Sequence, residues 1–393
     1  MSQGTTRAAS GTATRRLTAA ALALPLAATG LLTATAGPAQ AAPRSGAAIT
    51  VSLGDSYISG EAGRWQGNSD TFTGSRSGTD RAWTGHGYDA SQVYGATAQN
   101  GCDRSDSAEV LSAFGADRAV NLACSGATTA NVFRAAHGGQ SFKGEAPQAD
   151  QLASLAAHRR VGTVVLSIGG NDLGFVHAIT QCVLDYEASA GDCRDSQQAA
   201  IDAQIDTAMA NVGTSIDEIR AVMSADGYAA SAYRIVLQSY PSPIPRSSED
   251  RYPQSGWSRT TKGGCPAGDD DLDWARDQMV PQVAQRLSEV AADRGVQFLD
   301  VQDLLQGHEV CSTSDQLAGS AQPPSAETSE WARFLTTGLT QGTKQESFHP
   351  NYYGQLALGQ CLSLIADQPA DQDFSCQSTP GQGTDGVYLT PAS

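Results

Sequence analysis

The chain has 393 residues, with 41 acidic against 25 basic ones and a formal net charge of −16 at neutral pH. So acidic a surface repels nucleic acids and anionic membranes, and we expect neither as a partner. The length allows one large α/β domain once an N-terminal segment is removed.

Residues 1–41 have the features of a secretory signal. Arg15-Arg16 end a positively charged segment, residues 17–32 are mostly Ala and Leu, and Ala39-Gln40-Ala41 matches a small-x-small cleavage site. The apolar run is too short for a membrane anchor. We expect an extracellular protein that begins at residue 42 and has no stable membrane anchor. The paired arginines leave open whether export follows the general or the twin-arginine route.

The first strand is predicted at residues 49–54, an apolar run with β-branched residues. It ends at Gly54, and Asp55-Ser56-Tyr57 follow directly. Ligands of open α/β sheets bind at the carboxyl ends of the strands. The Ser56 hydroxyl is therefore a candidate functional group.

Residues 60–100 show little periodicity and are rich in Gly, Ser, Thr, Asp and aromatic residues. So long a loop inside a domain is typical of a functional insertion. We expect it to face the substrate, with Trp65, Trp83 and Tyr88 as wall residues. The alternative is that these aromatic side chains only hold the loop in place.

Strands and helices then alternate, which predicts an α/β fold with a mainly parallel sheet of five strands and helices on both faces. The further strands are expected at 118–122, 163–168, 233–239 and 296–301. The helices are expected at 107–116, 148–160, 175–186, 196–224, 274–294 with a kink at Pro281, and 353–365. One domain, 42–376, is followed by a flexible tail, 377–393. Prolines 241, 243 and 245 open a second long loop that lasts to about residue 271.

The eight cysteines all follow the signal, and an even number in an exported chain indicates disulfides. No Cys-x-x-Cys pair occurs, so a zinc site is not expected. Sequence does not determine the connectivity, and we take sequential pairing as the working prediction. The pairs are Cys102 with Cys124, Cys182 with Cys193, Cys265 with Cys311, and Cys361 with Cys376.

Three later segments carry groups suited to act with Ser56: Cys124-Ser125-Gly126-Ala127, Gly169-Gly170-Asn171-Asp172 and Ser347-Phe348-His349-Pro350-Asn351. A serine hydroxyl needs a neighbouring base to become a nucleophile, and the imidazole of His349 suits that task near neutral pH. Attack on a carbonyl creates an oxyanion, which needs preorganised donors. The N–H groups of Ser56 and Gly126 and the amide of Asn171 are the candidates.

These segments resemble those of the SGNH hydrolases, also called GDSL esterases and lipases. The resemblance implies a three-layer α/β/α fold with a flavodoxin-like sheet, and a hydrolase that needs no cofactor and no metal. It implies Ser56 as nucleophile, His349 as base, and Gly126 and Asn171 as oxyanion donors. With its signal and cysteines, the chain is similar to the secreted bacterial lipases and esterases. The resemblance covers the core of the mature chain, not its two long loops.

The chain departs from the family pattern in one position. The family usually has an aspartate three residues before the histidine, and this chain has Glu346 there. Glu346 is one candidate to orient the imidazole. The backbone carbonyl of Ser347 is the other, since some secreted bacterial members use a carbonyl.

Each motif also has a structural explanation. Ser56 and Gly126 suit turns, His349 suits a loop, and Asn171 suits a helix N-cap. Asp55 and Asp172 are expected to brace their loops. The remaining histidines share no spacing and are not predicted to bind metal; they are His86, His137, His158, His177 and His308.

The sequence therefore predicts a secreted, monomeric carboxylic ester hydrolase acting on a lipid or small-molecule ester. The rival among enzymes is a carbohydrate acetylesterase that uses Trp65, Trp83 and Trp257 as sugar platforms. A binding protein without turnover is the alternative from another class.

Overall fold

A computed structural model gives the structure of this chain and describes residues 46–71, 78–336 and 341–392. The signal expected at residues 1–41 lies outside the described residues. Within them, no helix combines the length and the apolar composition needed to cross a lipid bilayer.

The strands form one sheet in the order β2-β1-β3-β4-β5-β6-β7. Neighbouring strands are parallel from β2 to β6, and β7 pairs antiparallel with β6 at the edge. The mainly parallel α/β sheet predicted from the sequence is confirmed. The strands are β1 (Ile49–Gly54), β2 (Ala119–Asn121), β3 (Val161–Ser167), β4 (Arg234–Gln238), β5 (Gln297–Asp300), β6 (Phe374–Gln377) and β7 (Tyr388–Pro391).

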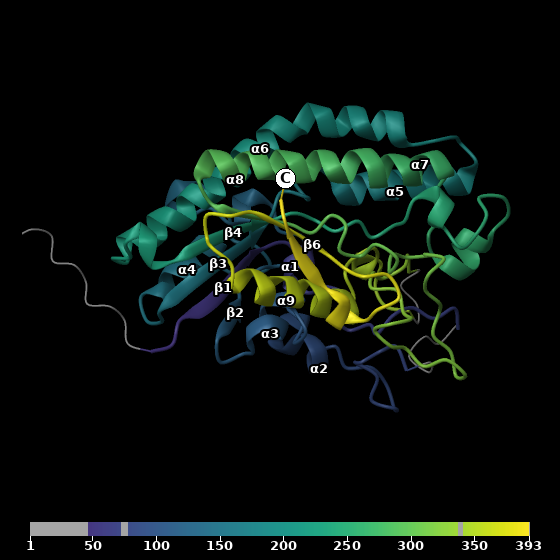
Figure 1. Ribbon diagram of the computed structural model, residues 1–393, viewed down its shortest axis with the longest axis horizontal. Helices are drawn as coiled ribbons and strands as arrows, with labels where there is room; N and C mark the ends of the chain where they lie inside the picture. Colours follow the sequence, from purple (N-terminus) through teal and green to yellow (C-terminus); the bar gives the residue numbers. More distant parts are fainter. Residues whose placement is uncertain (1–45, 72–77, 337–340, 393) are drawn as a thin grey trace, which may run out of the picture. The chain divides into compact units, whose positions relative to one another are not determined.

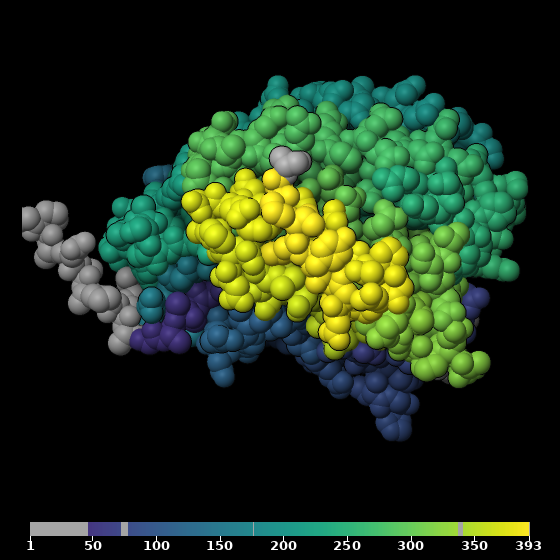
Figure 2. Space-filling model, viewed as in Figure 1, coloured from purple at the N-terminus to yellow at the C-terminus, as the bar shows by residue number. Residues whose placement is uncertain are grey.

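The predictions of five strands and of a flexible tail after residue 376 are wrong. The sheet has seven strands, and β7 lies within the expected tail, where Ser375 of β6 pairs with Thr390. Both added strands have only four residues. They are held by ladder hydrogen bonds to a neighbouring strand, which local hydrophobic periodicity does not reveal. In the space-filling view the C-terminal residues (yellow) form part of the molecular surface (Figure 2).

Helices cover both faces of the sheet (Figure 1). One face carries α4 (Gln148–Ala156), α6 (Arg194–Ala225) and α8 (Val280–Arg294), and α5 (Phe175–Ala188) and α7 (Asp269–Trp274) lie on the same side. The other face carries α3 (Glu109–Phe114) and α9 (Tyr352–Ala366), which pack on each other. The short helices α1 (Ser56–Ser59) and α2 (Ser91–Tyr94) lie between β1 and α3 in the chain.

In β3, β4 and β5, successive apolar residues enter two different hydrophobic cores. Val164 and Leu166 of β3 contribute to the core that also holds α4, α6 and α8, whereas Val165 contributes to the core that holds α9. Because side chains alternate across a strand, a sheet buried on both faces produces continuous apolar runs. Residues 164–166 of β3 form such a run, whereas in β1 the polar residues Thr50 and Ser52 alternate with apolar ones.

The predicted helix 274–294 consists of three pieces. After α7 ends at Trp274, residues 275–279 form a π-helical turn, and α8 begins at Val280. Pro281 lies in the first turn of α8, directly after the π-helical turn. The irregularity therefore precedes the proline, at the π-helical turn.

The structure contains the four disulfides that sequential pairing predicts: Cys102–Cys124, Cys182–Cys193, Cys265–Cys311 and Cys361–Cys376. The first joins two loops beside Ser125 and Gly126. The last joins α9 to β6, so it helps to hold the edge of the sheet.

Candidate active site

Ser56 and His349 meet although 293 positions separate them in the chain. The Ser56 Oγ lies 2.7 Å from the His349 Nε2. The other ring nitrogen, Nδ1, lies 3.0 Å from the carbonyl oxygen of Ser347. Because a carbonyl only accepts hydrogen bonds, this contact assigns the proton to Nδ1. The Nε2 lone pair then faces the serine hydroxyl, which donates to it.

Burial determines the charge of His349. It lowers the pKa of the imidazole to about 4, because a buried imidazolium loses its hydration, while backbone groups such as the Ser347 carbonyl act in the opposite direction. The ring is therefore neutral at neutral pH. A neutral imidazole with a free Nε2 lone pair can accept the proton of the serine.

The turn after β1 needs its glycine to present Ser56. Gly54 has a φ of 144°, and a Cβ there would lie 1.9 Å from the Ser167 carbonyl oxygen of the neighbouring strand. The Gln148 side chain accepts from the Gly54 N–H at 2.7 Å and donates to the Gly54 carbonyl at 2.8 Å. Asp55 caps α1 by accepting from the Tyr57 N–H. The backbone that carries Ser56 is thus fixed on both sides.

Tyr240, just after β4, joins two of the predicted segments. Its hydroxyl donates to the Asp55 carboxylate and accepts from the Gly170 N–H at 3.0 Å. Burial raises the pKa of Asp55 to about 7 and also raises the pKa of the Tyr240 hydroxyl, which therefore stays protonated. Asp55 and Tyr240 together brace the Ser56 turn against the loop that holds Asn171.

The candidate oxyanion donors follow β1, β2 and β3, which are neighbours in the sheet. Gly126 is exposed and has a φ of 82°, and neither its N–H nor that of Ser56 donates to a protein acceptor among the described residues. Asn171 donates one amide hydrogen to the Ala127 carbonyl at 2.8 Å, which leaves the second available. Asp172 accepts from Thr129, so the loops after β2 and β3 are held together.

The carboxylate of Glu346, one of the two candidates to orient His349, makes no hydrogen bond or ion pair with the imidazole among the described residues. The Glu346 carboxylate instead accepts from the Thr343 N–H at 2.7 Å and from the Tyr94 hydroxyl at 3.2 Å. It caps a short 3₁₀ turn, Lys344–Glu346, so its side chain is directed back along the chain. The Ser347 carbonyl, the alternative that the sequence left open, is the group in contact with Nδ1.

The three aromatic residues predicted to form walls of the substrate site differ in burial. Trp65 is fully buried and its ring contacts the guanidinium groups of Arg64 and Arg333, so it holds its loop in place and is no wall residue. Trp83 and Tyr88 are 38% and 62% exposed. Among the described residues, each group with metal-ligand spacing consists of one disulfide pair and one aspartate, and disulfide sulfurs are not thiolate ligands.

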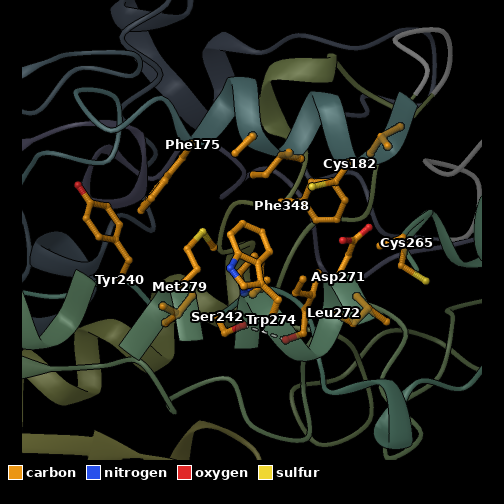
Figure 3. Close-up of a pocket in the computed structure, with 18 of the residues that line it drawn as sticks. Phe175, Cys182, Tyr240, Ser242, Cys265, Asp271, Leu272, Trp274, Met279 and Phe348 are labelled. Atoms are coloured by element: carbon orange, nitrogen blue, oxygen red, sulfur yellow. Dashed lines mark hydrogen bonds between the residues drawn. The ribbon is translucent and has the colours of Figure 1, made fainter. Parts of the chain in front are cut away.

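The structure contains an apolar cavity whose lining includes residues next to Ser56 and His349 in the chain. Tyr57 and Phe348, the chain neighbours of these two residues, contribute to its lining. The rest comes mostly from α5, the second long loop, and the segment from α7 to α8. In Figure 3 the side chain of Phe175 faces those of Trp274 and Met279 across the cavity. No lining residue belongs to the described part of the 60–100 loop.

Neither Gln148 nor Tyr240 belongs to the sequence motifs. Gln148 is the first residue of α4, and its sequence context indicates only a helix. Tyr240 lies two residues after the carboxyl end of β4. Placement at a strand end was the signal that identified the other segments, and it would have identified Tyr240 as well.

Comparison with known proteins gives one family and several relatives. Residues 52–357 match the GDSL-like Lipase/Acylhydrolase family. Over 233 residues the chain is 29% identical to Lipase 1 of Streptomyces coelicolor, covering 59% of this chain and 64% of that protein, so it spans less than two thirds of the relative.

Two similar solved structures come from the same genus. The phospholipase A1 of Streptomyces albidoflavus is 23% identical with a TM-score of 0.49, and the alignment covers 82% of this chain and 100% of that one. The extracellular lipase of Streptomyces rimosus is 24% identical with a TM-score of 0.43, at the same coverage. The family match extends over most of the chain and includes Ser56, Gly126, Asn171 and His349. This chain belongs to the GDSL-like lipase/acylhydrolase family.

Proposed function

We propose that this protein is a secreted carboxylic ester hydrolase that works through an acyl-enzyme on Ser56. The observation that carries the proposal is the 2.7 Å contact between the Ser56 Oγ and an unprotonated His349 Nε2. Family membership supports the reaction class. The four disulfides are compatible with an extracellular protein.

In the first half-reaction the Ser56 Oγ attacks the ester carbonyl carbon while Nε2 takes the hydroxyl proton. The carbonyl oxygen becomes an oxyanion, which accepts from the N–H groups of Ser56 and Gly126 and from the Asn171 amide. Loss of one such donor typically costs about 3 kcal/mol of barrier. The imidazolium then donates its proton to the leaving alcohol, and the Ser347 carbonyl keeps the ring oriented throughout. In the second half-reaction, His349 takes a proton from water, whose oxygen attacks the acyl carbon. The imidazolium then returns that proton to the Ser56 Oγ as the Oγ–acyl bond breaks and the carboxylic acid leaves.

The apolar cavity favours an acyl chain as the group bound beside Ser56. Its walls are hydrophobic and aromatic side chains, including Phe175, Ile179, Trp274 and Phe348. Burial of each methylene against such walls is worth about 0.8 kcal/mol. An acetyl group would leave most of this surface uncovered. We therefore infer a lipase or esterase specificity for esters with several methylenes in the acyl part.

The carbohydrate acetylesterase alternative has less support than the lipase or esterase specificity. Of its three expected sugar platforms, Trp65 is fully buried, and Trp83 and Trp257 remain exposed. Acyl-chain length separates the two functions, because a deacetylase favours acetyl over octanoyl esters.

Replacement of Ser56 by Ala tests the mechanism directly. We expect Ser56→Ala to abolish turnover of nitrophenyl esters and labelling by a fluorophosphonate, with unchanged thermal unfolding. Ser154→Ala, which alters an exposed serine of α4, is the matched control. Full turnover by Ser56→Ala contradicts the mechanism. A wild-type protein that neither labels nor turns over supports the binding-protein alternative.

Secretion is tested separately. We expect the protein recovered from culture medium to begin at residue 42, as measured by intact mass. A full-length mass in the cell fraction alone would contradict the localisation.

A further inference from the structure

Lys143 holds the peptide that carries the Gly126 N–H. Its ammonium nitrogen donates to the carbonyl oxygen of Ser125 at 2.7 Å and to the carbonyl of Gly101. Ser125 is buried, and Lys143 is one of only three lysines in the chain. None of the sequence motifs includes it.

The geometry of the peptide bond links Lys143 to the oxyanion donor. The Ser125 carbonyl and the Gly126 N–H belong to one planar unit, and in a trans peptide they point in opposite directions. A carbonyl held by Lys143 therefore directs the N–H away from the lysine. That N–H donates to no protein acceptor among the described residues. The peptide is thus fixed at its acceptor end and open at its donor end.

The charge of Lys143 also strengthens the donor. A cation at the carbonyl oxygen draws electron density along the amide, so the N–H on the other side becomes a better hydrogen-bond donor. Burial lowers the pKa of the ammonium, while the neighbouring carboxylates of Glu61 and Asp103 raise it. The positive end of the polarised peptide is the end that would meet a developing oxyanion.

Other contacts hold the position of Ser125 without supplying charge. Its N–H donates to the Cys102 carbonyl at 3.1 Å, and its Oγ accepts from Gln345 at 2.8 Å. The Cys102–Cys124 disulfide closes the same region. Lys143 is therefore not needed to keep the two loops together, and its particular contribution is a cation at the Ser125 carbonyl.

We infer that Lys143 is a positioning residue that orients and polarises the Gly126 N–H for the oxyanion of the transition state. The inference rests on the proposed function, in which Gly126 is an oxyanion donor. It assigns the lysine an effect on kcat and on the binding of transition-state analogues, and little effect on substrate binding.

The test compares Lys143→Met with Lys143→Arg and with Lys262→Met, which alters an exposed lysine. The measurements are kcat and KM for a nitrophenyl ester and the inhibition constant of an alkyl boronic acid, which forms a tetrahedral anion on serine. For Lys143→Met we expect kcat and boronate affinity to fall by the same factor, about 10- to 100-fold, with KM within about twofold of wild type. Lys143→Arg should retain most of both, and Lys262→Met should match wild type.

Wild-type kcat and boronate affinity in Lys143→Met would overturn the inference. Equal losses of kcat and boronate affinity in Lys143→Met and Lys143→Arg, accompanied by lower thermal stability, would also overturn it. Such losses would mean that Lys143 only stabilises the fold. If Lys143→Met does not fold, Lys143→Gln keeps a neutral donor and should lie between wild type and the expected loss. Ester turnover by the wild type and its absence in Ser56→Ala test the proposed function independently, so the two can fail separately.

Discussion

The Tyr57 hydroxyl donates a hydrogen bond of 2.9 Å to the carbonyl oxygen of Phe348, the residue before His349. Phe348 has a φ of 61°, a left-handed conformation that a non-glycine residue adopts at a cost. The Tyr57 ring also packs on the imidazole, with ring centroids 4.9 Å apart. Tyr57, the residue after Ser56, thus holds the loop that carries His349.

We predict that Tyr57→Phe lowers kcat by about 10- to 100-fold, because small errors in the position of the base are costly. Loss of the hydroxyl frees the Phe348 peptide to relax toward an ordinary φ and moves the imidazole with it. Steady-state kinetics on a short ester measure the effect. Tyr186→Phe is the matched control, since the Tyr186 hydroxyl also donates to a carbonyl at 2.9 Å, that of Gln254. Equal kinetics in both variants would refute the role of Tyr57.

The low pKa of His349 predicts activity at acid pH. The imidazole must be unprotonated to accept the serine proton, and burial lowers its pKa to about 4 from an ordinary 6.5. The acid limb of the kcat/KM profile should therefore have its midpoint near 4. Rates from pH 3.5 to 8, with protein stability checked at each pH, measure it. A midpoint near 6.5 would show that the imidazole is hydrated in the working enzyme.

Glu346→Gln should keep turnover within about tenfold of wild type. Loss of a carboxylate that orients a catalytic histidine costs about 10⁴-fold, but the Glu346 carboxylate contacts Thr343 and Tyr94 instead. Steady-state kinetics separate the two outcomes. A loss beyond a thousandfold in a folded variant would restore Glu346 as the orienting group.

Filling the apolar cavity should shift the acyl preference. Ala178 of α5 lines the cavity, and a phenylalanine there would occupy the space of several methylenes. We expect Ala178→Phe to lower kcat/KM for octanoyl esters by about tenfold or more while acetyl esters stay within about twofold. Ala188→Phe, at the exposed end of the same helix, is the control. Parallel losses on both esters would mean that the acyl chain binds elsewhere.

Buried carboxyl groups predict that the protein is more stable at mildly acidic than at alkaline pH. Burial raises the pKa of Glu109 to about 8 from 4.5, and a hydrogen bond from Gln238 only partly offsets this. The folded state therefore binds this proton more tightly than the unfolded state. The contribution of Glu109 to the free energy of unfolding is therefore complete below about pH 4.5, and it is lost as the pH rises through about 8.

Between pH 5 and 8 the free energy of unfolding should fall by up to about 1.4 kcal/mol per pH unit for each such group. Denaturant unfolding at pH 6 and pH 9 measures the difference. Glu109→Gln, which resembles the protonated acid, should flatten the dependence. An identical pH dependence in Glu109→Gln and wild type would show that Glu109 does not contribute.

The sequence by itself determined the parallel α/β class, because strands buried on both faces leave apolar runs that helices separate. It also identified Ser56, Gly126, Asn171 and His349 as candidates, since each lies in a short motif after a strand or before the last helix. The sequence did not predict the short strands β6 and β7, because their stability comes from pairing with neighbouring strands and not from a local hydrophobic pattern.

Only the tertiary structure decided which group orients His349 and which side chains support the site. Glu346 has the right spacing from His349 in sequence, but its 3₁₀ turn directs the carboxylate to Thr343 and Tyr94. Tyr240 and Lys143 contact the site through hydrogen bonds to residues distant in the chain. Such contacts depend on the direction of single side chains and peptides, which chain folding sets and local sequence does not encode.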